Sequence, residues 1–228
     1  MRTSDSPEQL AALERSARAA IEFLRQDVGV LHYTLLPYDL PLIVLTAFFQ
    51  HFPRIHPRSR ELLSRWVWRG ALTAEHQNNT LHMRRALIAI VPGAEHETIQ
   101  RLLASVPRQM DDTLELQPFA LNWARCRIQL LAQVNLRPRH LMTGVPVAFQ
   151  TSITEVTRNL LPDASALWQS HLANRIIHPT LRRGFRAALL DVKDPELLAT
   201  HLITPEAVQR LRDGDDEGFF AARAANQR

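Results

Sequence analysis

Cysteine, lysine and glycine are scarce in this chain of 228 residues, and each shortage narrows the chemistry available to the protein. The single cysteine, Cys126, excludes internal disulfides and cysteine-based zinc sites, and it suits a reducing environment. The seven glycines leave little room for a glycine-rich phosphate loop or a dinucleotide-binding fingerprint, and neither motif occurs. Lys193 is the only lysine, so arginine carries almost all of the positive charge and keeps it near neutral pH.

Long apolar runs are also missing. The longest, around residues 40–49, is interrupted by Pro41 and Thr46 and is much shorter than the ~20 residues that a membrane-spanning helix needs. The first residues lead directly into an amphipathic pattern that contains acids, which fits neither a signal peptide nor a transit peptide. Because 46% of the residues are hydrophobic, the chain can bury a sizeable core. We therefore expect a cytoplasmic protein with no membrane partner.

Apolar residues recur mainly at helical spacing, so the sequence predicts a mainly α fold. Ser6 and Pro7 start the first helix, which is expected to end near residues 27–29. Its predicted buried face consists of Leu10, Leu13, Ala17, Ile21 and Leu24. Further helices are expected up to residue 49 and at 57–70, 80–91, 95–105, 118–134, 164–173 and 179–190, with two short ones on either side of 213–216.

The character of the sequence changes after Arg137. Residues 137–146 carry loop signals, and residues 147–156 are rich in β-branched side chains without helical spacing, which predicts a short β-hairpin. The sequence therefore predicts two domains: a multi-helix domain over residues 1–136, and a smaller helical region over residues 137–228 that contains the hairpin.

The ten histidines do not have the spacing of metal ligands. The segment His96-Glu97-Thr98-Ile99-Gln100 has glutamine where a zinc-protease helix has its second histidine. His51 and His56 are five residues apart with a proline between them, and His76 and His82 are six apart, so neither pair shares a helical face. No nucleophile elbow occurs either. The sequence therefore predicts no metal site and no cofactor.

Basic residues gather in two segments of a chain whose formal net charge is only +4. Residues 40–94 carry seven basic and two acidic side chains, and residues 116–190 carry nine and two. Because arginine binds phosphate oxygens in a bidentate way, these segments are candidates for a nucleic-acid interface, with Trp66 and Trp68 available to stack on a base. The alternative is a helix with one apolar face and one solvated arginine face. The candidate contact residues are Arg54, Arg58, Arg65, Arg69, Arg182 and Arg183.

Several stretches resemble a known family. Residues 36–45, Phe48-Phe49 and residues 63–69 resemble the central helical region of GmrSD-type restriction proteins, which are bacterial anti-phage nucleases. Residues 124–131 with Pro138 and Thr143-Gly144 are similar to the connection that follows in that family. The tail is similar as well, through residues 194–203 and Phe219, Phe220 and Arg223. Full-length members of the family have an amino-terminal ParB-like domain with an Asp-Gly-Gln-Gln-Arg nucleotide-handling motif, a helical middle and a carboxy-terminal His-Asn-His nuclease domain.

The chain departs from that family at the residues that carry its chemistry. Active members have a His-His-Ile-Phe-Pro-like segment, which supplies a general base and a metal ligand, where this chain has Arg158-Asn159-Leu160-Leu161-Pro162. Arginine cannot accept a proton near neutral pH, and asparagine is a poor metal ligand, so the resemblance implies a degenerate region without catalysis. Asn174, which corresponds to the asparagine that orients the loop, and His178 remain as weak catalytic candidates. The Asp-Gly-Gln-Gln-Arg motif is absent, so the resemblance implies that the chain is a fragment, a split-gene subunit or a solo relative, and a protein partner is a candidate carrier of the ParB-like domain.

Three hypotheses follow. The first is a non-catalytic module of a GmrSD-like defence system that binds DNA or docks onto the partner with the active domain. The second is a cryptic metal-dependent nuclease that uses Asn174, His178 and His171 together with Glu155 or Asp163. The third is a structural subunit whose apolar surface, around residues 40–49, packs on a protein partner.

Overall fold

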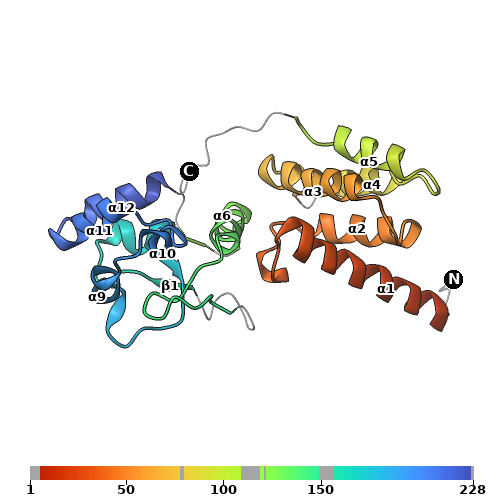
Figure 1. Ribbon diagram of the computed structural model, residues 1–228. Coiled ribbons are helices and arrows are strands. Elements are labelled where there is room, and N and C mark those ends of the chain that lie inside the picture. Colours follow the sequence, from red (N-terminus) through yellow and green to blue (C-terminus); the bar gives the residue numbers. More distant parts are fainter. Residues whose placement is uncertain (1–5, 78–79, 109–118, 121, 149–156, 227–228) are drawn as a thin grey trace. The chain divides into compact units, whose positions relative to one another are not determined.

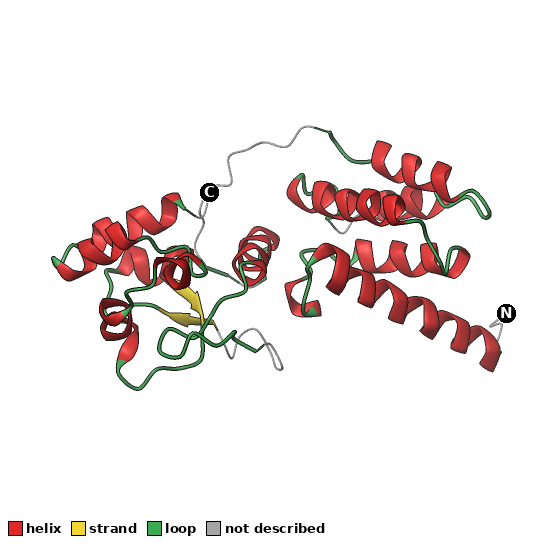
Figure 2. Ribbon diagram, viewed as in Figure 1, coloured by secondary structure: helices red, strands yellow, loops and turns green. Residues whose placement is uncertain are grey.

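The computed structural model describes residues 6–77, 80–108, 119–120, 122–148 and 157–226, and it confirms the mainly α fold (Figure 1). Figure 2 shows one small two-stranded antiparallel sheet beside the helices. The chain divides into two compact units, Met1–Asp111 and Asp112–Arg228, which we call the N-terminal and C-terminal units.

The division between the units lies 25 residues before the boundary expected at 136/137 (136 − 111 = 25). The loop signals after Arg137 belong to a turn within the C-terminal unit. Arg139 and Pro146 form an isolated antiparallel bridge there, and Leu141 is buried in that unit's hydrophobic core. The change in sequence character after Arg137 thus corresponds to a turn and not to the boundary between the units. Turns inside a unit need the same glycine, proline and polar residues as linkers between units, so composition does not distinguish them.

The N-terminal unit consists of five α-helices and two short helical segments in the part of the chain that the structure describes. Local signals explain their starts: the Ser6 side chain and Gln9 form a capping box at the first helix, and His56 caps the third. The elements are α1 (Pro7–Phe23), a π-helical segment η1 (Leu24–Val28), η2 (Tyr33–Leu35), α2 (Leu40–His51), α3 (Pro57–Leu72), α4 (Thr80–Ile88) and α5 (Glu95–Ala104).

Helix α2 supplies much of the core of the N-terminal unit. Val44, Leu45 and Phe48 are completely buried, and the ring of Phe49 lies 5.8 Å from that of Phe23 on α1. Of residues 40–49, only Ile43 is exposed. The docking surface that the third hypothesis placed around these residues is therefore wrong, because the run is interior to its own unit.

The buried face of α1 also differs from the prediction. Leu10, Leu13 and Ile21 are about half exposed, at 54%, 48% and 48%, whereas Ser16, Ala20 and Phe23 are buried. The small side chains of Ser16 and Ala20 allow α1 to pack closely on α2, and the Ser16 hydroxyl is satisfied by the carbonyl of Ala12 at 3.0 Å. Periodicity located an apolar stripe correctly but could not say which side of the helix a neighbour covers.

Helix α3 is tied to η1 through side chains at every fourth position. The Arg60 guanidinium donates two hydrogen bonds, of 2.8 and 2.7 Å, to the Asp27 carboxylate, which raises the pKa of Arg60. The Ser64 hydroxyl donates to the Asp27 carbonyl at 3.1 Å, and the Trp68 indole donates to the Val28 carbonyl at 3.2 Å. These contacts satisfy carbonyl groups at the carboxyl end of a helix, where no further turn supplies N–H partners.

The C-terminal unit surrounds a short β-hairpin with helices (Figure 1). Strand β1 (Thr157–Asn159) pairs with β2 (Arg175–Ile177), with Arg158 opposite Ile176. The expected hairpin at 147–156 falls largely on residues 149–156, which lie outside the described residues. The helical elements are α6 (Ala124–Asn135), α8 (Ala166–Gln169), η3 (Leu172–Asn174), α9 (Gly184–Asp191), α10 (Pro195–Ala199), α11 (Pro205–Arg212) and α12 (Asp216–Ala225).

The core of the C-terminal unit joins the hairpin to the last helices. Its completely buried members include Leu160, Leu189, Phe219 and Phe220, and Ile176 of β2 packs in the same cluster. The chain therefore enters the hydrophobic core directly after β1. This burial fixes the positions of the residues that follow Arg158.

Candidate functional site

Asn174, directly before β2, binds the segment that follows β1 in the interior of the C-terminal unit. Its side chain is completely buried, accepts a hydrogen bond from the Leu161 N–H at 2.8 Å and donates one to the Leu161 carbonyl at 3.0 Å. Its own carbonyl accepts from the Leu160 N–H at 2.8 Å. The asparagine amide thus extends the hairpin ladder by one side chain and holds the loop that begins at Leu160 against the start of β2.

Arg158 stands where the resemblance expects the first histidine. Its Nε donates to the Thr180 hydroxyl at 3.1 Å, and one terminal nitrogen donates to the Thr157 carbonyl at 3.1 Å. The neighbouring Asn159 lies opposite Arg175 in the hairpin. The Arg158 side chain therefore offers hydrogen-bond donors and cannot accept a proton.

His178 is completely buried one residue after β2, with both ring nitrogens in use. Nε2 accepts from the Leu141 N–H at 2.9 Å, and Nδ1 donates to the Pro179 carbonyl at 2.6 Å. Burial lowers the pKa of His178 and favours the neutral ring that this arrangement requires. A metal ion at Nε2 would displace the bond to Leu141, so the geometry favours a structural role for this histidine.

His171 has a local role at the start of η3. Its Nδ1 accepts from the Ala173 N–H at 3.0 Å, and burial together with the charge of Arg223 lowers its pKa. Glu155, one of the two acids considered for a cryptic nuclease, lies outside the described residues. Within the described ranges, no three histidine, cysteine, aspartate or glutamate side chains are grouped to hold a metal ion.

Sequence reasoning did not assign a site role to Arg223, although it is the most unusual charged residue of the unit. This arginine of α12 is completely buried, and burial lowers its pKa to about 9. It donates to the carbonyl of His201 at 3.1 Å and to the carbonyl of Ala173. His201 in turn donates to the Arg139 carbonyl at 2.7 Å. The signals in the sequence were the resemblance of the tail, which includes Arg223, and the position of this arginine within the apolar segment 219–225.

The predicted nucleic-acid contacts of the N-terminal unit lie on and before α3. Arg58, Arg65 and Arg69 project from the side of α3 opposite the buried Leu63 and Val67, and we call these three residues the arginine ridge. Arg58 forms an ion pair with Glu61 in which both side chains are about 60% exposed. Such exposed pairs contribute little to stability. In the described part of the chain, Arg65 and Arg69 have no ion-pair partner.

The remaining predicted contacts fall in different places. Arg54 is exposed in the loop before α3, whereas Arg182 and Arg183 are exposed in the loop before α9 of the other unit. The two tryptophans do not both provide a stacking surface. Trp66 is only 1% exposed, so the proposed base stacking on its ring is wrong. Trp68 is partly buried and its indole N–H donates to the Val28 carbonyl.

Comparison with known proteins identified no relative of this chain. No family model matches the chain, and no curated protein or solved structure shows significant similarity to it. None of the helices in the described part of the chain is long and apolar enough to cross a membrane. The resemblance to GmrSD-type restriction proteins therefore stays a prediction from the sequence.

Proposed function

We propose that this chain is a non-catalytic module of a GmrSD-like defence system that binds the backbone of duplex DNA through the arginine ridge of α3. The observation that carries the DNA contact is the ridge itself, in which Arg58 and Arg65 are exposed and Arg69 is partly buried, and in which Arg65 and Arg69 lack ion-pair partners among the described residues. Guanidinium groups that are not neutralised by acids attract phosphate and bind its oxygens in a bidentate way.

The non-catalytic part of the proposal is supported by the hairpin. Arg158 donates hydrogen bonds at the position of the expected general base, and Asn174 keeps its loop-holding contacts to Leu161. Recruiting His178 to a metal would leave the buried Leu141 N–H without a partner, which costs about 1–3 kcal/mol. A nuclease-like scaffold with this arrangement can position a loop without performing hydrolysis.

Salt dependence separates phosphate binding from other modes of association. Each phosphate contact releases condensed counterions, so the slope of log affinity against log salt becomes steeper by about 0.9 per contact on duplex DNA. Removing Arg65 and Arg69 together is therefore expected to make that slope shallower by about 2.

The test is a fluorescence-anisotropy titration of the full chain against a labelled DNA duplex at several salt concentrations. Wild-type protein is compared with the double variant Arg65→Ala and Arg69→Ala. The matched control replaces Arg15 and Arg18 of α1 by alanine, since both are exposed on the same unit and their loss changes the net charge equally. Affinity that is indifferent to salt, or that falls equally in both double variants, would contradict the ridge as the contact surface.

The cryptic-nuclease alternative has its own test. Supercoiled plasmid is incubated with the full chain and magnesium or manganese, and the proposal predicts that it stays intact. Cleavage that disappears in His178→Ala would reverse the assignment. The DNA-binding titration is independent of this result, because the arginine ridge and His178 lie in different units.

A further inference from the structure

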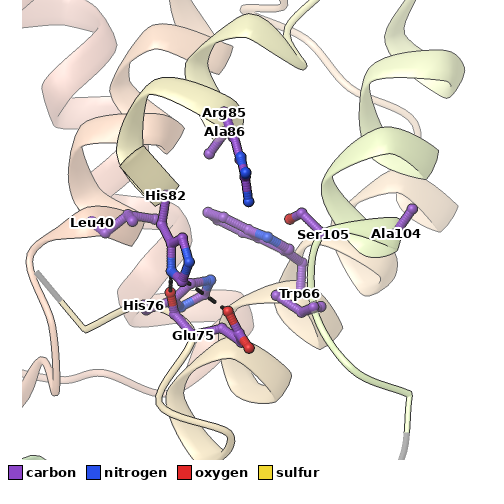
Figure 3. A pocket seen from close by; sticks show the side chains of 10 residues that line it. Leu40, Trp66, Glu75, His76, His82, Arg85, Ala86, Ala104 and Ser105 are labelled. Atoms are coloured by element: carbon purple, nitrogen blue, oxygen red, sulfur yellow. Dashed lines mark hydrogen bonds and ion pairs between the residues drawn. The ribbon is translucent and has the colours of Figure 1, made fainter. Parts of the chain in front are cut away.

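A cavity of about 280 Å³ lies inside the N-terminal unit and is lined by residues of α2, α3, α4 and α5 (Figure 3). Two of its lining residues, Trp66 and His76, are only 1% and 2% exposed. The His76 ring packs over Gly70, where a Cβ atom would lie 2.1 Å from Nε2. The ring nitrogens of both residues are therefore enclosed by protein, and a ligand in the cavity cannot reach them. Accessible apolar groups of this unit lie instead on the outer side of α1.

Helix α1 carries an apolar stripe that its own unit leaves uncovered. Leu10, Leu13, Ala17 and Ile21 follow one another at spacings of three and four residues, so they share one side of the helix. The three large side chains are about half exposed, and Ala17 is partly buried. In Figure 1, α1 lies at the edge of the N-terminal unit, with α2 on its inner side. A row of large apolar side chains on the outer face of a helix is typical of a surface that packs on another helix.

A shallow groove continues the stripe toward the carboxyl end of α1. It has a volume of about 460 Å³, and its apolar lining consists of Ile21 and of Leu31, which follows η1 and is 36% exposed. The polar lining consists of Arg18, Glu22, Arg25 and Gln26. The groove therefore offers an apolar floor with charged sides, which suits one apolar side chain from a partner helix.

The charges beside the stripe select the orientation of such a helix. Glu14 and Arg18 lie one turn apart on one edge of the stripe, and they form an exposed ion pair at 2.7 Å. In a pair of antiparallel α1 helices related by a two-fold axis, the same edge of both copies meets. With the axis midway between these two residues, Glu14 of each copy faces Arg18 of the other. A parallel pair would set this edge against the opposite one, where Ser16 and Ala20 already pack on α2.

The same antiparallel arrangement also pairs the apolar side chains. Leu10 of one copy then lies level with Ile21 of the other, where the groove lined by Leu31 begins. Leu13 of one copy lies beside Ala17 of the other, and the small side chain of Ala17 allows the two helices to approach closely. Apolar and charged positions are therefore satisfied by one register, which makes this face of α1 complementary to itself.

We propose that this face of α1, formed by Leu10, Leu13, Ala17 and Ile21 with Glu14 and Arg18 at its edge, binds a second copy of the chain in an antiparallel α1 pair. One helix face per copy is a small interface, so the dimer forms at high concentration and dissociates on dilution. Unfolding of dilute protein accordingly reports the monomer, in which Leu13 is half exposed. The surface shares no residue with the arginine ridge, so self-association goes beyond the proposed function.

The first experiment is sedimentation equilibrium of the full chain from low to high micromolar concentration. Wild-type protein is expected to shift from monomer to dimer over this range. Leu13→Glu is expected to weaken self-association about tenfold or more, because it places a carboxylate in the apolar contact. The matched control is Ile88→Glu, since Ile88 on α4 is 76% exposed in the same unit and lies outside the stripe. Circular dichroism verifies that both variants remain folded.

The second experiment tests the pairing of charges. Glu14→Arg and Arg18→Glu alone are each expected to weaken self-association about three- to tenfold, because like charges then face each other twice in the dimer. Both residues are exposed, so neither change is expected to disturb the fold. An equimolar mixture of the two variants should recover association, since each copy of one variant then presents two charges opposite in sign to those of the other.

The outcomes are separate from those of the duplex-binding test. Association that is lost in Leu13→Glu, kept in Ile88→Glu and recovered in the mixture supports the proposal. A chain that stays monomeric at every concentration, or association unchanged by Leu13→Glu, overturns it, and a mixture that does not recover overturns the antiparallel pairing. Leu13→Glu leaves the arginine ridge intact and is expected to bind duplex DNA as wild type does, whereas Arg65→Ala with Arg69→Ala leaves α1 and its self-association intact.

Discussion

The Asn174 side chain binds both backbone hydrogen-bonding groups of Leu161, accepting from its N–H at 2.8 Å and donating to its carbonyl at 3.0 Å. These residues are 13 positions apart, and the loop between them contains α8 and most of η3. One buried amide therefore closes a long loop whose ends the hairpin alone would hold less tightly.

Asn174→Asp is expected to destabilise the C-terminal unit by roughly 3 kcal/mol. The substitution keeps the shape but replaces the donor to the Leu161 carbonyl by a buried acceptor, and two oxygens then face each other. The measurement is urea unfolding followed by far-UV circular dichroism. Asn122→Asp is the control, since Asn122 is exposed, and equal effects of the two substitutions would show that the contact to Leu161 is unimportant.

Acid is expected to destabilise the protein through its buried neutral histidines. Burial lowers the pKa of His76 to about 3 and that of His201 to about 4, below the 6.5 of an unfolded chain. Between these values the unfolded chain binds more protons, so the stabilisation is complete above pH 6.5 and is lost as pH falls toward the folded-state values. Each histidine contributes about 2 kcal/mol less at pH 5 than at pH 7.

The measurement is denaturant unfolding at pH 7.5, 6 and 5, with separate probes for the two units because they need not unfold together. His76→Phe should flatten the pH dependence of the N-terminal unit only. Unfolding free energies that do not change over this range would show that burial does not keep these two histidines neutral in solution.

Gly70→Ala tests the close approach of His76 to α3. Alanine normally stabilises a helix relative to glycine by about 1 kcal/mol, but here its Cβ would lie 2.1 Å from the imidazole. We therefore expect a net loss of roughly 2 kcal/mol, from the strain of overpacking. The double variant with His76→Ala should recover much of this loss, and a stabilising Gly70→Ala would show that the ring is free to move aside.

The orientation of α1 is tested by a pair of leucines. Leu13→Ala should cost roughly 0.5 kcal/mol or less because Leu13 is 48% exposed, whereas Leu45→Ala should cost about 3 kcal/mol because Leu45 is completely buried. Thermal unfolding of the two variants is sufficient for the comparison. Equal losses would mean that the outer face of α1 is covered in solution.

The helices were largely predictable because their signals are local. Pro7 and Pro57 start α1 and α3 as expected, and Gly29 ends the first helical segment with a φ of 84°, as a left-handed closing residue does. A segment with weaker signals was overextended, because the expected helix at 164–173 is reduced to α8 and η3. The expected hairpin at 147–156 falls largely outside the described residues and stays a prediction, and β1 begins at Thr157. Strand pairing joins residues far apart, and the periodicity of a three-residue strand is too short to detect.

Of the site residues, the exposed positions of Arg58 and Arg65 on α3 followed from helical spacing, whereas the state of the histidines did not. Nothing near His178 in the sequence indicates that the N–H of Leu141 binds its Nε2, and nothing near Trp66 indicates that His76 packs against it. Both contacts arise from segments brought together by folding.

By itself, the sequence determined the helical class, most helix starts, the scarcity of residues for disulfides or phosphate loops, and the absence of histidine at positions 158 and 159, because these depend on residue type and near neighbours. Tertiary structure alone decided which face of α1 is buried, that Arg223 lies in the core, and that Trp66 and His76 line one cavity. The physical reason is that burial and hydrogen-bond satisfaction depend on which distant segments pack together, and helical periodicity does not specify the partner.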